Sequence, residues 1–457
     1  MGELKLKGAA FGIPLSDTVV ITTTGRTSNF GYAFTPGSIS LLYLHHIYLN
    51  LKYKVFFNMK EDSPFTPGSP VPVELFVGRV EQIKEILKYI KQSASGRQEN
   101  VFLEGERGIG KSSLAAFLRY LANKESFLAV YVSLGGVTEL EELVRRIFEQ
   151  ILKEANAEKS LGEKFLGLFK KYVKQVDLFG ISLAFSPPRE ELENMLRNFP
   201  EAIKGVMDKL KEEKSGIFIA LDDINGLSTN PDFANWYKSF VDSVAIRYPS
   251  NFPAFIMSIG LPEIRDSLSR LQPSLMRIFR VVSVEKLSDA EVKEFFEKAF
   301  KKVNMEVEPE ALEDMVKFSS GLPILMHEIG DAVFWNDEDG KISEDDALTG
   351  IFDAADRIGK KYLDPKVYRA IRSPRYRSIL RKLGEEPMPI SYFKKKEIES
   401  KLNAGERKVF NNFLRKMREL GIIVPDIEGG RGAYKFVNEL YPVYIWLENQ
   451  RFLKSNF

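Results

Sequence analysis

The fold is decided by the stretch GERGIGKSS, residues Gly105–Ser113. It fits the pattern G-x-x-x-x-G-K-[ST] and lies between an apolar segment, ENVFLEG, and a predicted helix over residues 111–123. Glycines permit a tight loop whose backbone N–H groups face a phosphate, and the following helix adds its positive N-terminal dipole. The stretch therefore predicts a phosphate-binding loop at the end of a buried strand.

Each residue type in this loop has an expected chemical task. Lys111 is expected to bridge the β- and γ-phosphates of ATP or ADP, and the Ser112 hydroxyl to reach a magnesium ion. The other predicted nucleotide contacts of the loop are Gly105, Glu106, Arg107, Gly108, Ile109, Gly110 and Ser113. The pattern thus predicts a magnesium-dependent ATPase.

A second stretch, SGIFIALDDINGLS over residues 215–228, reads as an apolar strand that ends in two aspartates. Asp222 is expected to hold magnesium, and Asp223 is the candidate for positioning the attacking water. The Asp223 carboxylate is one methylene shorter than that of glutamate, which predicts slow hydrolysis. The alternative is that Asp223 only caps a turn.

Three residues further along the chain are candidates for completing the catalytic site. Ser258, at the end of the predicted strand FPAFIMSIG, is placed to sense the γ-phosphate, or it is an ordinary strand residue. Arg277 and Arg280 precede the predicted strand RVVSVEKL, where an arginine can reach the nucleotide of a neighbouring subunit. That role implies a homo-oligomer, whereas surface ion pairs are the alternative.

Strands that alternate with helices predict an α/β fold with a parallel sheet covered by helices on both faces. Residues 73–287 are the predicted P-loop domain, with an insertion at about 155–188. Residues 288–360 read as an all-α lid, in which Ser288 and Glu291 form a capping box. Residues 361–457 read as a winged helix, described below.

Residues 1–72 are predicted to form an arm that is either β-rich or proline-rich. Its apolar stretches TVVITTT and LLYLHHIYLNL read as strands. An alternative is that the protein begins at Met59 and that residues 1–58 are translated upstream sequence.

The composition excludes several classes of protein. The 457 residues include no cysteine and three histidines, so disulfides and thiolate metal sites are excluded. The most apolar run, over residues 39–57, contains two lysines and two histidines and is a poor membrane span. With no signal peptide, the sequence predicts a cytoplasmic protein without a membrane partner.

The C-terminal segment combines strong positive charge with a recognisable element order. Residues 361–457 carry 21 Lys and Arg against 11 Asp and Glu, a net charge of +10, whereas the whole chain is +2. Three predicted helices over residues 376–386, 392–402 and 404–424 precede a glycine-rich hairpin over residues 425–438. This is the pattern of a helix-turn-helix with a wing, which predicts DNA binding.

The basic side chains expected to contact DNA lie in the second and third helices and on the wing. They are Lys394, Lys395, Lys396, Arg407, Lys408, Arg415, Lys416, Arg431 and Lys435. The alternative is that the winged helix contacts protein.

Residues 75 to about 335 resemble the AAA+ class, in the branch that joins archaeal initiator-like ATPases to signal-transduction ATPases with numerous domains (STAND). The resemblance rests on FVGR, the phosphate loop, IALDD, SIGLPEIRDSL and SGLP. It implies that Val77, Gly78 and Arg79 lie beside the adenine, and that Gly321 and Pro323 of the lid touch the nucleotide.

One departure from the family pattern bears on turnover. Initiators carry an arginine near the start of the lid helix, where this chain has GLPILMHE and His327 is the nearby candidate. This departure and Asp223 resemble the signalling branch, which holds ADP tightly. Two functions are therefore expected: an ATPase that couples nucleotide state to DNA binding, or a signalling or defence switch with a protein-binding winged helix.

Overall fold

The chain forms two compact units in a computed structural model, Met1–Glu61 and Asp62–Phe457. The structure describes residues 3–7, 18–23, 30–31, 60, 62–157, 161, 169, 172–176 and 182–455. The described part of the first unit is an antiparallel sheet of β1 (Glu3–Lys7), β2 (Thr18–Thr23) and β3 (Phe30–Gly31). The predicted strand over residues 41–51 and the possible start at Met59 lie outside the described residues.

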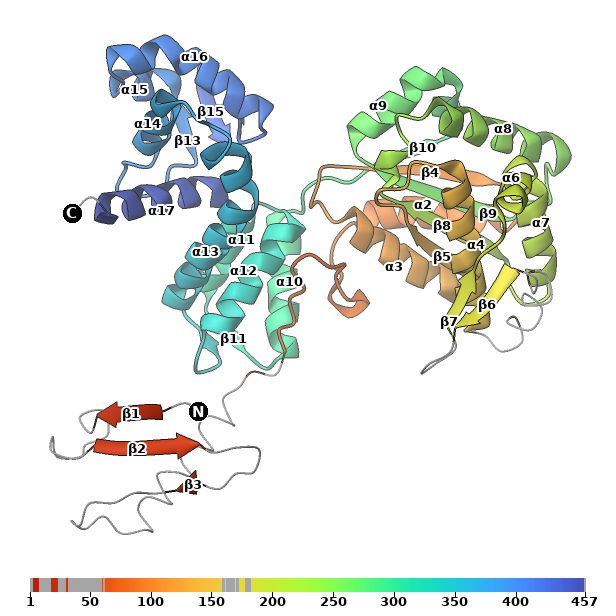
Figure 1. The fold of residues 1–457 in the computed structure, drawn as a ribbon, viewed down its shortest axis with the longest axis horizontal. Coiled ribbons are helices and arrows are strands. Elements are labelled where there is room, and N and C mark those ends of the chain that lie inside the picture. Colours follow the sequence, from red (N-terminus) through yellow and green to blue (C-terminus); the bar gives the residue numbers. More distant parts are fainter. Residues whose placement is uncertain are drawn as a thin grey trace. The chain divides into compact units, whose positions relative to one another are not determined.

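A five-stranded parallel sheet is the centre of the second unit, in the order β10-β4-β9-β8-β5 (Figure 1). Its strands are β4 (Glu99–Glu104), β5 (Phe127–Ser133), β8 (Gly216–Asp222), β9 (Ala254–Gly260) and β10 (Arg280–Ser283). The central strands β4, β9 and β8 are mostly apolar and are buried along nearly their whole length, because both faces of the sheet are covered. This confirms the predicted α/β P-loop fold.

Helices cover the two faces of this sheet and create two cores. One face packs on α2 (Val80–Ser93) and α3 (Lys111–Lys124). The other packs on α4 (Leu140–Asn156), α7 (Phe199–Leu210) and α8 (Pro231–Arg247). Because side chains alternate along a strand, neighbouring residues of β8 or β9 belong to different cores. This alternation decides which strand residues can face the phosphate loop.

The predicted insertion is described in part. It contains an antiparallel pair, β6 (Val173–Val176) and β7 (Ser182–Phe185), which precedes α6 (Arg189–Arg197). Phe185 is buried, and its ring lies 6.1 Å from that of Phe148 on α4. The described part of the insertion therefore extends the core on the α4 side.

The lid follows β10 and consists mainly of helices. Within residues 289–358 these are α10 (Asp289–Lys302), α11 (Pro309–Ser319), α12 (Pro323–Asn336) and α13 (Glu344–Ile358). The capping box of Ser288 and Glu291 is present. The lid is not purely helical, because Glu306–Val307 (β11) and Lys341–Ile342 (β12) form a short parallel pair.

Residues 62–72, here called the N-terminal strap, belong to the second unit rather than to the arm predicted for residues 1–72. The reason is that Phe65 is buried in the lid core, with its ring 5.0 Å from Phe300 and 5.8 Å from Phe295. The lid makes room for this ring at Gly330, where any β-carbon would lie 2.2 Å from Phe65.

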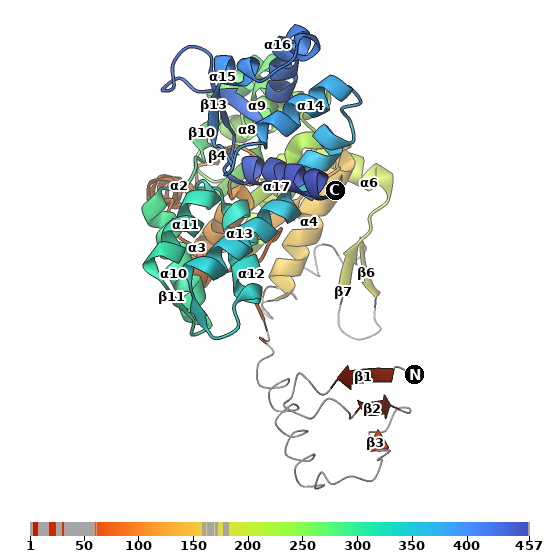
Figure 2. The ribbon, with the colours of Figure 1, turned by 90° about the vertical axis from the view of Figure 1, so that its left-hand side faces the viewer.

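The C-terminal elements begin with a π-helix, Gly359–Tyr368, that continues from α13. They continue as α14 (Pro374–Leu383), β13 (Tyr392–Lys394), α15 (Lys395–Ser400), α16 (Ala404–Glu419), β14 (Ile423–Pro425), β15 (Ala433–Phe436) and α17 (Leu440–Ser455). The strands form an antiparallel sheet in the order β13-β15-β14. Helix α17 packs along α13, as Figures 1 and 2 both show.

Candidate functional site

The predicted phosphate loop lies at the carboxyl end of β4, and α3 begins at Lys111. The first turn of the lid helix α12 lies directly against this loop. The Ile324 N–H donates to the Gly108 carbonyl at 3.3 Å, and a β-carbon at Gly108 would lie 2.8 Å from the Ile324 side chain. Gly108 also has a φ of +80°, so both its conformation and this close approach require glycine. The loop and the lid are therefore in direct contact.

Lys111 points back into the loop that precedes it. Its Nζ donates to the carbonyls of Gly105 at 2.9 Å and of Glu106 at 2.8 Å. Burial lowers the pKa of Lys111, and the charge of Asp222 partly offsets this effect. The ammonium group thus lies where the predicted phosphates would arrive.

Ser112, Asp222 and Tyr131 form a cluster on the α3 side of the sheet. The Ser112 hydroxyl donates to the Asp222 carboxylate at 2.7 Å, and the Tyr131 hydroxyl donates to the same carboxylate oxygen. Tyr131 pairs in register with Ala220, two residues before Asp222, so both side chains occupy one face of the sheet. Burial, followed by the charge of Asp222, raises the pKa of Tyr131, which keeps its hydroxyl protonated.

Magnesium prefers hard oxygen ligands and is usually held by one or two protein groups together with nucleotide phosphates and water. The Ser112 hydroxyl and the Asp222 carboxylate supply oxygen donors of this kind beside the loop. The donor set therefore fits the ion that the sequence predicts at these residues.

Asp223 lies next to Asp222 but in a different environment. It is exposed and has a φ of +61°, which is uncommon for a residue other than glycine. Its carboxylate accepts a hydrogen bond from the Asn225 amide and also faces Gly135 of the loop after β5. Asp223 does not cap the following turn through its side chain, in contrast to the alternative considered from the sequence.

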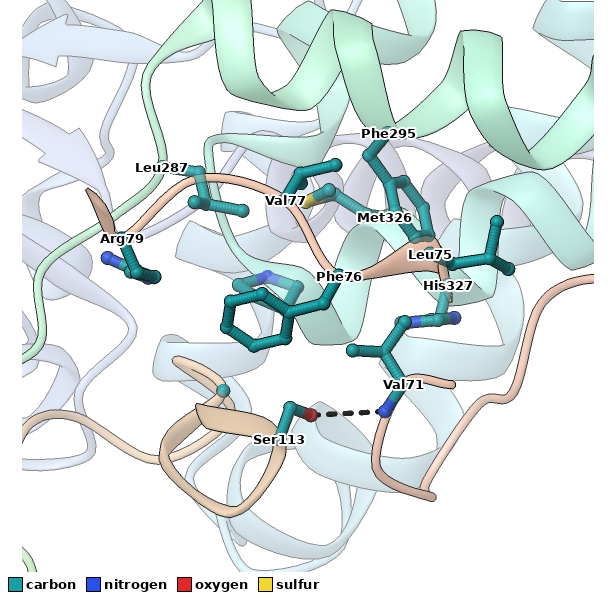
Figure 3. A pocket seen from close by; sticks show the side chains of 12 residues that line it. Val71, Leu75, Phe76, Val77, Arg79, Ser113, Leu287, Phe295, Met326 and His327 are labelled. Atoms are coloured by element: carbon teal, nitrogen blue, oxygen red, sulfur yellow. Dashed lines mark hydrogen bonds between the residues drawn. The ribbon is translucent and has the colours of Figure 1, made fainter. Parts of the chain in front are cut away.

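A small apolar pocket lies between the strap, the FVGR segment and the lid (Figure 3). Its lining includes Val71, Phe76, Val77, Leu287, Pro323 and Met326. The Ser113 hydroxyl accepts the Val71 N–H at 3.2 Å and so ties the strap to the first turn of α3. The pocket therefore brings two of the predicted adenine contacts, Val77 and Arg79, together with Pro323 beside Gly110.

Arg79 lines the same pocket but is bonded to the protein itself. Its guanidinium donates to the Ile109 carbonyl at 3.1 Å and to the Glu285 carbonyl, and its N–H donates to Glu291 at 3.2 Å. Burial lowers the pKa of Arg79, which the nearby carboxylates of Glu291 and Glu285 counteract. A β-carbon at the neighbouring Gly78 would lie 2.3 Å from Glu291, so the chain passes very close to the lid there.

The predicted sensing role of Ser258 does not agree with its position. Ser258 pairs with Leu221, and strand alternation places it with Ile256 on the face covered by α8. Asp222 lies on the opposite face, with α3. Ser258 is fully buried, so its hydroxyl is part of the core rather than of the phosphate site.

The two candidate arginines have different surroundings. Arg280 begins β10 in register with Val101, at the end of the parallel sheet opposite the loop. It forms an ion pair with the buried Glu99 at 2.9 Å and stacks on the Tyr89 ring at 4.5 Å. Arg277 is exposed, and within the described part of the chain it makes no hydrogen bond or ion pair. This geometry disfavours Arg280 as a catalytic residue and leaves Arg277 available.

His327 is a structural residue and does not replace the lid arginine. Its Nδ1 accepts the Thr66 N–H at 3.0 Å, and its ring packs edge-on against Phe295 at 5.0 Å. Burial lowers the pKa of His327 to about 4, with a small opposing effect of Asp331. His327 therefore anchors the strap as a neutral side chain.

The basic residues predicted to contact DNA are exposed or half-buried on the end of β13, on α15 and α16, and on the hairpin. The Arg407 guanidinium donates to the carbonyls of Glu399 at 3.1 Å and Ser400 at 3.5 Å at the end of α15. Three others of the set form ion pairs on the surface: Arg415 and Lys416 with Glu419, and Lys435 with Asp426. Asn411 and Asn412, which sequence reasoning missed, are exposed on α16 one turn after Lys408. Amide side chains of this kind can read base edges, a signal that was present in the sequence.

The sheet order, the loop and the hydroxyl–carboxylate cluster together are typical of the P-loop nucleotide-binding fold. Residues 75–236 match the family model described as an AAA ATPase domain, so this segment is similar to AAA ATPase domains, a similarity that implies nucleotide binding.

Three proteins illustrate what the chain is similar to. An uncharacterized HTH-type transcriptional regulator from Methanocaldococcus jannaschii is 23% identical over 277 residues, which are 57% of this chain and 64% of that protein. The chain thus spans less than two thirds of the length of this curated relative. The solved ORC2 protein of Aeropyrum pernix, in ADPNP–ADP complexes, matches with a TM-score of 0.54 at 13% identity, over 87% of this chain and 98% of that one.

A Walker-type ATPase from Pyrococcus abyssi matches with a TM-score of 0.48 at 16% identity, over 81% of this chain and 96% of that one. The likeness to the ORC2 protein shows a shared fold. Among the described residues, no helix is both long and apolar enough to cross a membrane.

Proposed function

We propose that this protein binds ATP and magnesium, hydrolyses ATP slowly, and uses its nucleotide state to control DNA binding by a C-terminal winged helix. The observation that carries the proposal is a chain of contacts from the phosphate loop through the lid to the end of the hairpin. We interpret the C-terminal elements as a winged helix because three helices and a glycine-rich hairpin follow in that order.

The proposed roles at the phosphate loop follow from the side chains that meet there. Lys111 would leave the Gly105 and Glu106 carbonyls and donate to phosphate oxygens. Ser112 and Asp222 would hold magnesium, which supplies charge neutralisation at the phosphates. Tyr131 would fix the Asp222 carboxylate. These groups bind and orient the nucleotide.

Slow turnover is proposed from the surroundings of Asp223. Its carboxylate is already bonded to Asn225, and its short side chain reaches less far than that of glutamate would. A carboxylate engaged in this way orients a water less effectively, so we expect long-lived nucleotide states. An exposed arginine from a second copy, Arg277, would raise the rate if the protein assembles.

The contact chain starts where Ile324 of the lid bonds to Gly108 of the phosphate loop. Four residues earlier, the Ser320 hydroxyl accepts the Glu439 N–H at 3.0 Å, directly after the hairpin strand β15. Lys286 Nζ, in the linker between β10 and the lid, donates to the Val437 carbonyl at 3.4 Å. Residues 320–324, here called the lid loop, carry the contacts to Gly108 and to Glu439. A shift of the lid loop on nucleotide binding would therefore also move the residues at the base of the hairpin.

The DNA surface is proposed on α16, the start of α15 and the hairpin. Exposed lysines and arginines on these elements supply phosphate contacts, and the paired asparagines of α16 supply contacts to bases. The net charge of +10 over residues 361–457 supports a polyanionic partner.

Lys111→Ala in the full chain tests the nucleotide part of the proposal. We expect the wild type to copurify with nucleotide and to release phosphate slowly in the presence of magnesium, and Lys111→Ala to lose both properties. Lys124→Ala, an exposed lysine at the end of the same helix, is the matched control. Unchanged nucleotide affinity in Lys111→Ala would refute the assignment of the phosphate loop.

A further inference from the structure

A second pocket lies in the C-terminal part of the chain, away from the phosphate loop. It has a volume of about 440 Å³ and is formed by the end of the π-helix, by α14 and by α17. Ligand sites for small molecules typically have volumes of roughly 300–1,000 Å³. The pocket therefore has the size of a site for one small molecule, and no proposed role of α16 or the hairpin accounts for it.

Three arginines line this pocket, namely Arg372, Arg377 and Arg381. The acidic residue of the lining is Glu448, and its carboxylate already forms an ion pair with Arg451 at 2.6 Å. The lining thus carries an excess of positive charge that its own carboxylate does not neutralise. An anion would be attracted to such a pocket.

The arginines differ in how much of their bonding capacity the protein uses. Arg377 donates through Nε to the Ile371 carbonyl at 3.0 Å and through Nη2 to the Tyr368 carbonyl at 3.3 Å. Its Nη1 therefore remains able to donate to a ligand. Within the described residues, Arg372 makes no hydrogen bond or ion pair, and Arg381 contacts the Phe452 ring at 4.4 Å but no carboxylate within ion-pair distance.

Other basic side chains near these elements do find partners. Lys401 forms an ion pair with Glu386, and Arg451 forms one with Asp356 at 2.6 Å. In the pocket lining, by contrast, Arg372 and Arg381 form no ion pair with a carboxylate of the described residues. A guanidinium presents a planar fork of donors that matches phosphate oxygens.

The pocket also offers aromatic surface. Phe452 is 43% exposed and has its ring covered in part by Arg381, and Tyr368 belongs to the same lining. Aromatic rings and arginine planes both stack on planar bases. The lining thus combines groups for phosphate with groups for a base.

We propose that this pocket is a second nucleotide site, which takes a base and its phosphate either from a free mononucleotide or from a nucleic acid strand. Arg372 and Arg381 hold the phosphate, and Phe452 provides a face for the base. The site is independent of the phosphate loop, because it is built from other elements.

Binding stoichiometry in four full-length proteins tests the proposal. The wild type, Lys111→Ala, the double variant Arg372→Ala/Arg381→Ala, and the combination of all three are titrated with ADP and magnesium in a calorimeter. We expect two, one, one and zero sites. Each lost charge-assisted contact should weaken the second site by about tenfold. Arg375→Ala removes an exposed arginine of the same helix that does not line the pocket, and should leave two sites.

A single site in the wild type that is lost in Lys111→Ala would leave the phosphate loop assigned and overturn the second site for free nucleotide. A single site that is lost only in the variants lacking Arg372 and Arg381 would support the second site and would overturn the assignment of the phosphate loop. A short oligothymidylate, titrated into Lys111→Ala with and without the arginine changes, distinguishes the sources. Binding of the oligomer without ADP binding assigns the pocket to a strand, and binding of neither refutes the proposal.

Discussion

The Ser112 hydroxyl and the Asp222 carboxylate lie 2.7 Å apart, although 110 residues separate them along the chain. This contact joins the first turn of α3 to the end of β8, and it places two oxygen ligands beside the loop. We therefore expect Ser112→Ala and Asp222→Asn to retain nucleotide binding without magnesium but to lose its enhancement by magnesium. Nucleotide titrations with magnesium and with EDTA measure this difference.

Ser113→Ala is the matched control for Ser112→Ala. The Ser113 hydroxyl bonds to the strap rather than to Asp222, so its loss should leave the magnesium effect unchanged. Equal loss in both serine variants would contradict the assignment of the magnesium ligands.

Tyr131→Phe should raise the magnesium concentration needed for half-maximal nucleotide binding. The change removes the hydroxyl that holds Asp222 and leaves the ring in place, at a cost to stability of about 1 kcal/mol. A magnesium titration of nucleotide affinity is the measurement. An unchanged half-saturation point, in a protein with wild-type melting behaviour, would show that Tyr131 does not position Asp222.

Arg277→Ala and Arg280→Ala should have different effects: we expect Arg277→Ala to change turnover and Arg280→Ala to change stability. Loss of Arg280 leaves the buried Glu99 without its partner and should lower stability by about 1 kcal/mol, with little effect on turnover per folded molecule. Loss of Arg277 should leave stability unchanged and lower turnover only where the protein assembles. Turnover measured over a range of protein concentrations decides between these outcomes.

His327 should make stability depend on pH. Its folded pKa of about 4 lies below the ordinary value of 6.5, so the unfolded chain binds more protons between these values. The stabilisation is present above pH 6.5 and is lost as the pH falls towards 4, on the order of 3 kcal/mol in total. His327→Asn keeps an acceptor for the Thr66 N–H and should flatten the melting temperature between pH 7 and pH 5. An equally steep loss in the variant would assign the effect to other groups.

Much of the fold followed from local patterns in the sequence. The loop motif and the apolar strands can each be recognised within a few residues, and the parallel sheet confirms the fold that they predicted. Residues whose role depends on register were harder to place. Tyr131 sits in the middle of an apolar strand, and only the pairing of β5 with β8 brings its hydroxyl to Asp222.

Ser258 was predicted to be a site residue but lies in the core, and its position too depends on strand register. A serine near a strand end is a reasonable sensor in the sequence, but alternation turns its side chain away from the loop. Arg280 was misjudged because its partner Glu99 is far away in the chain. The strap was missed because the aromatic residues that hold Phe65 lie more than 200 positions later.

The central claim is that nucleotide state reaches the DNA surface through the lid loop, and Ser320→Gly tests it most directly. Ser320 has a φ of +54°, which suits glycine, so the change removes the acceptor of the Glu439 N–H without straining the backbone. DNA affinity is measured with ATP and with ADP, over a salt series, for the wild type and for Ser320→Gly. We predict a salt-dependent affinity that differs at least about fivefold between the nucleotides in the wild type and converges in the variant. Wild-type DNA affinity that is the same with both nucleotides, or absent at low salt, would contradict the account.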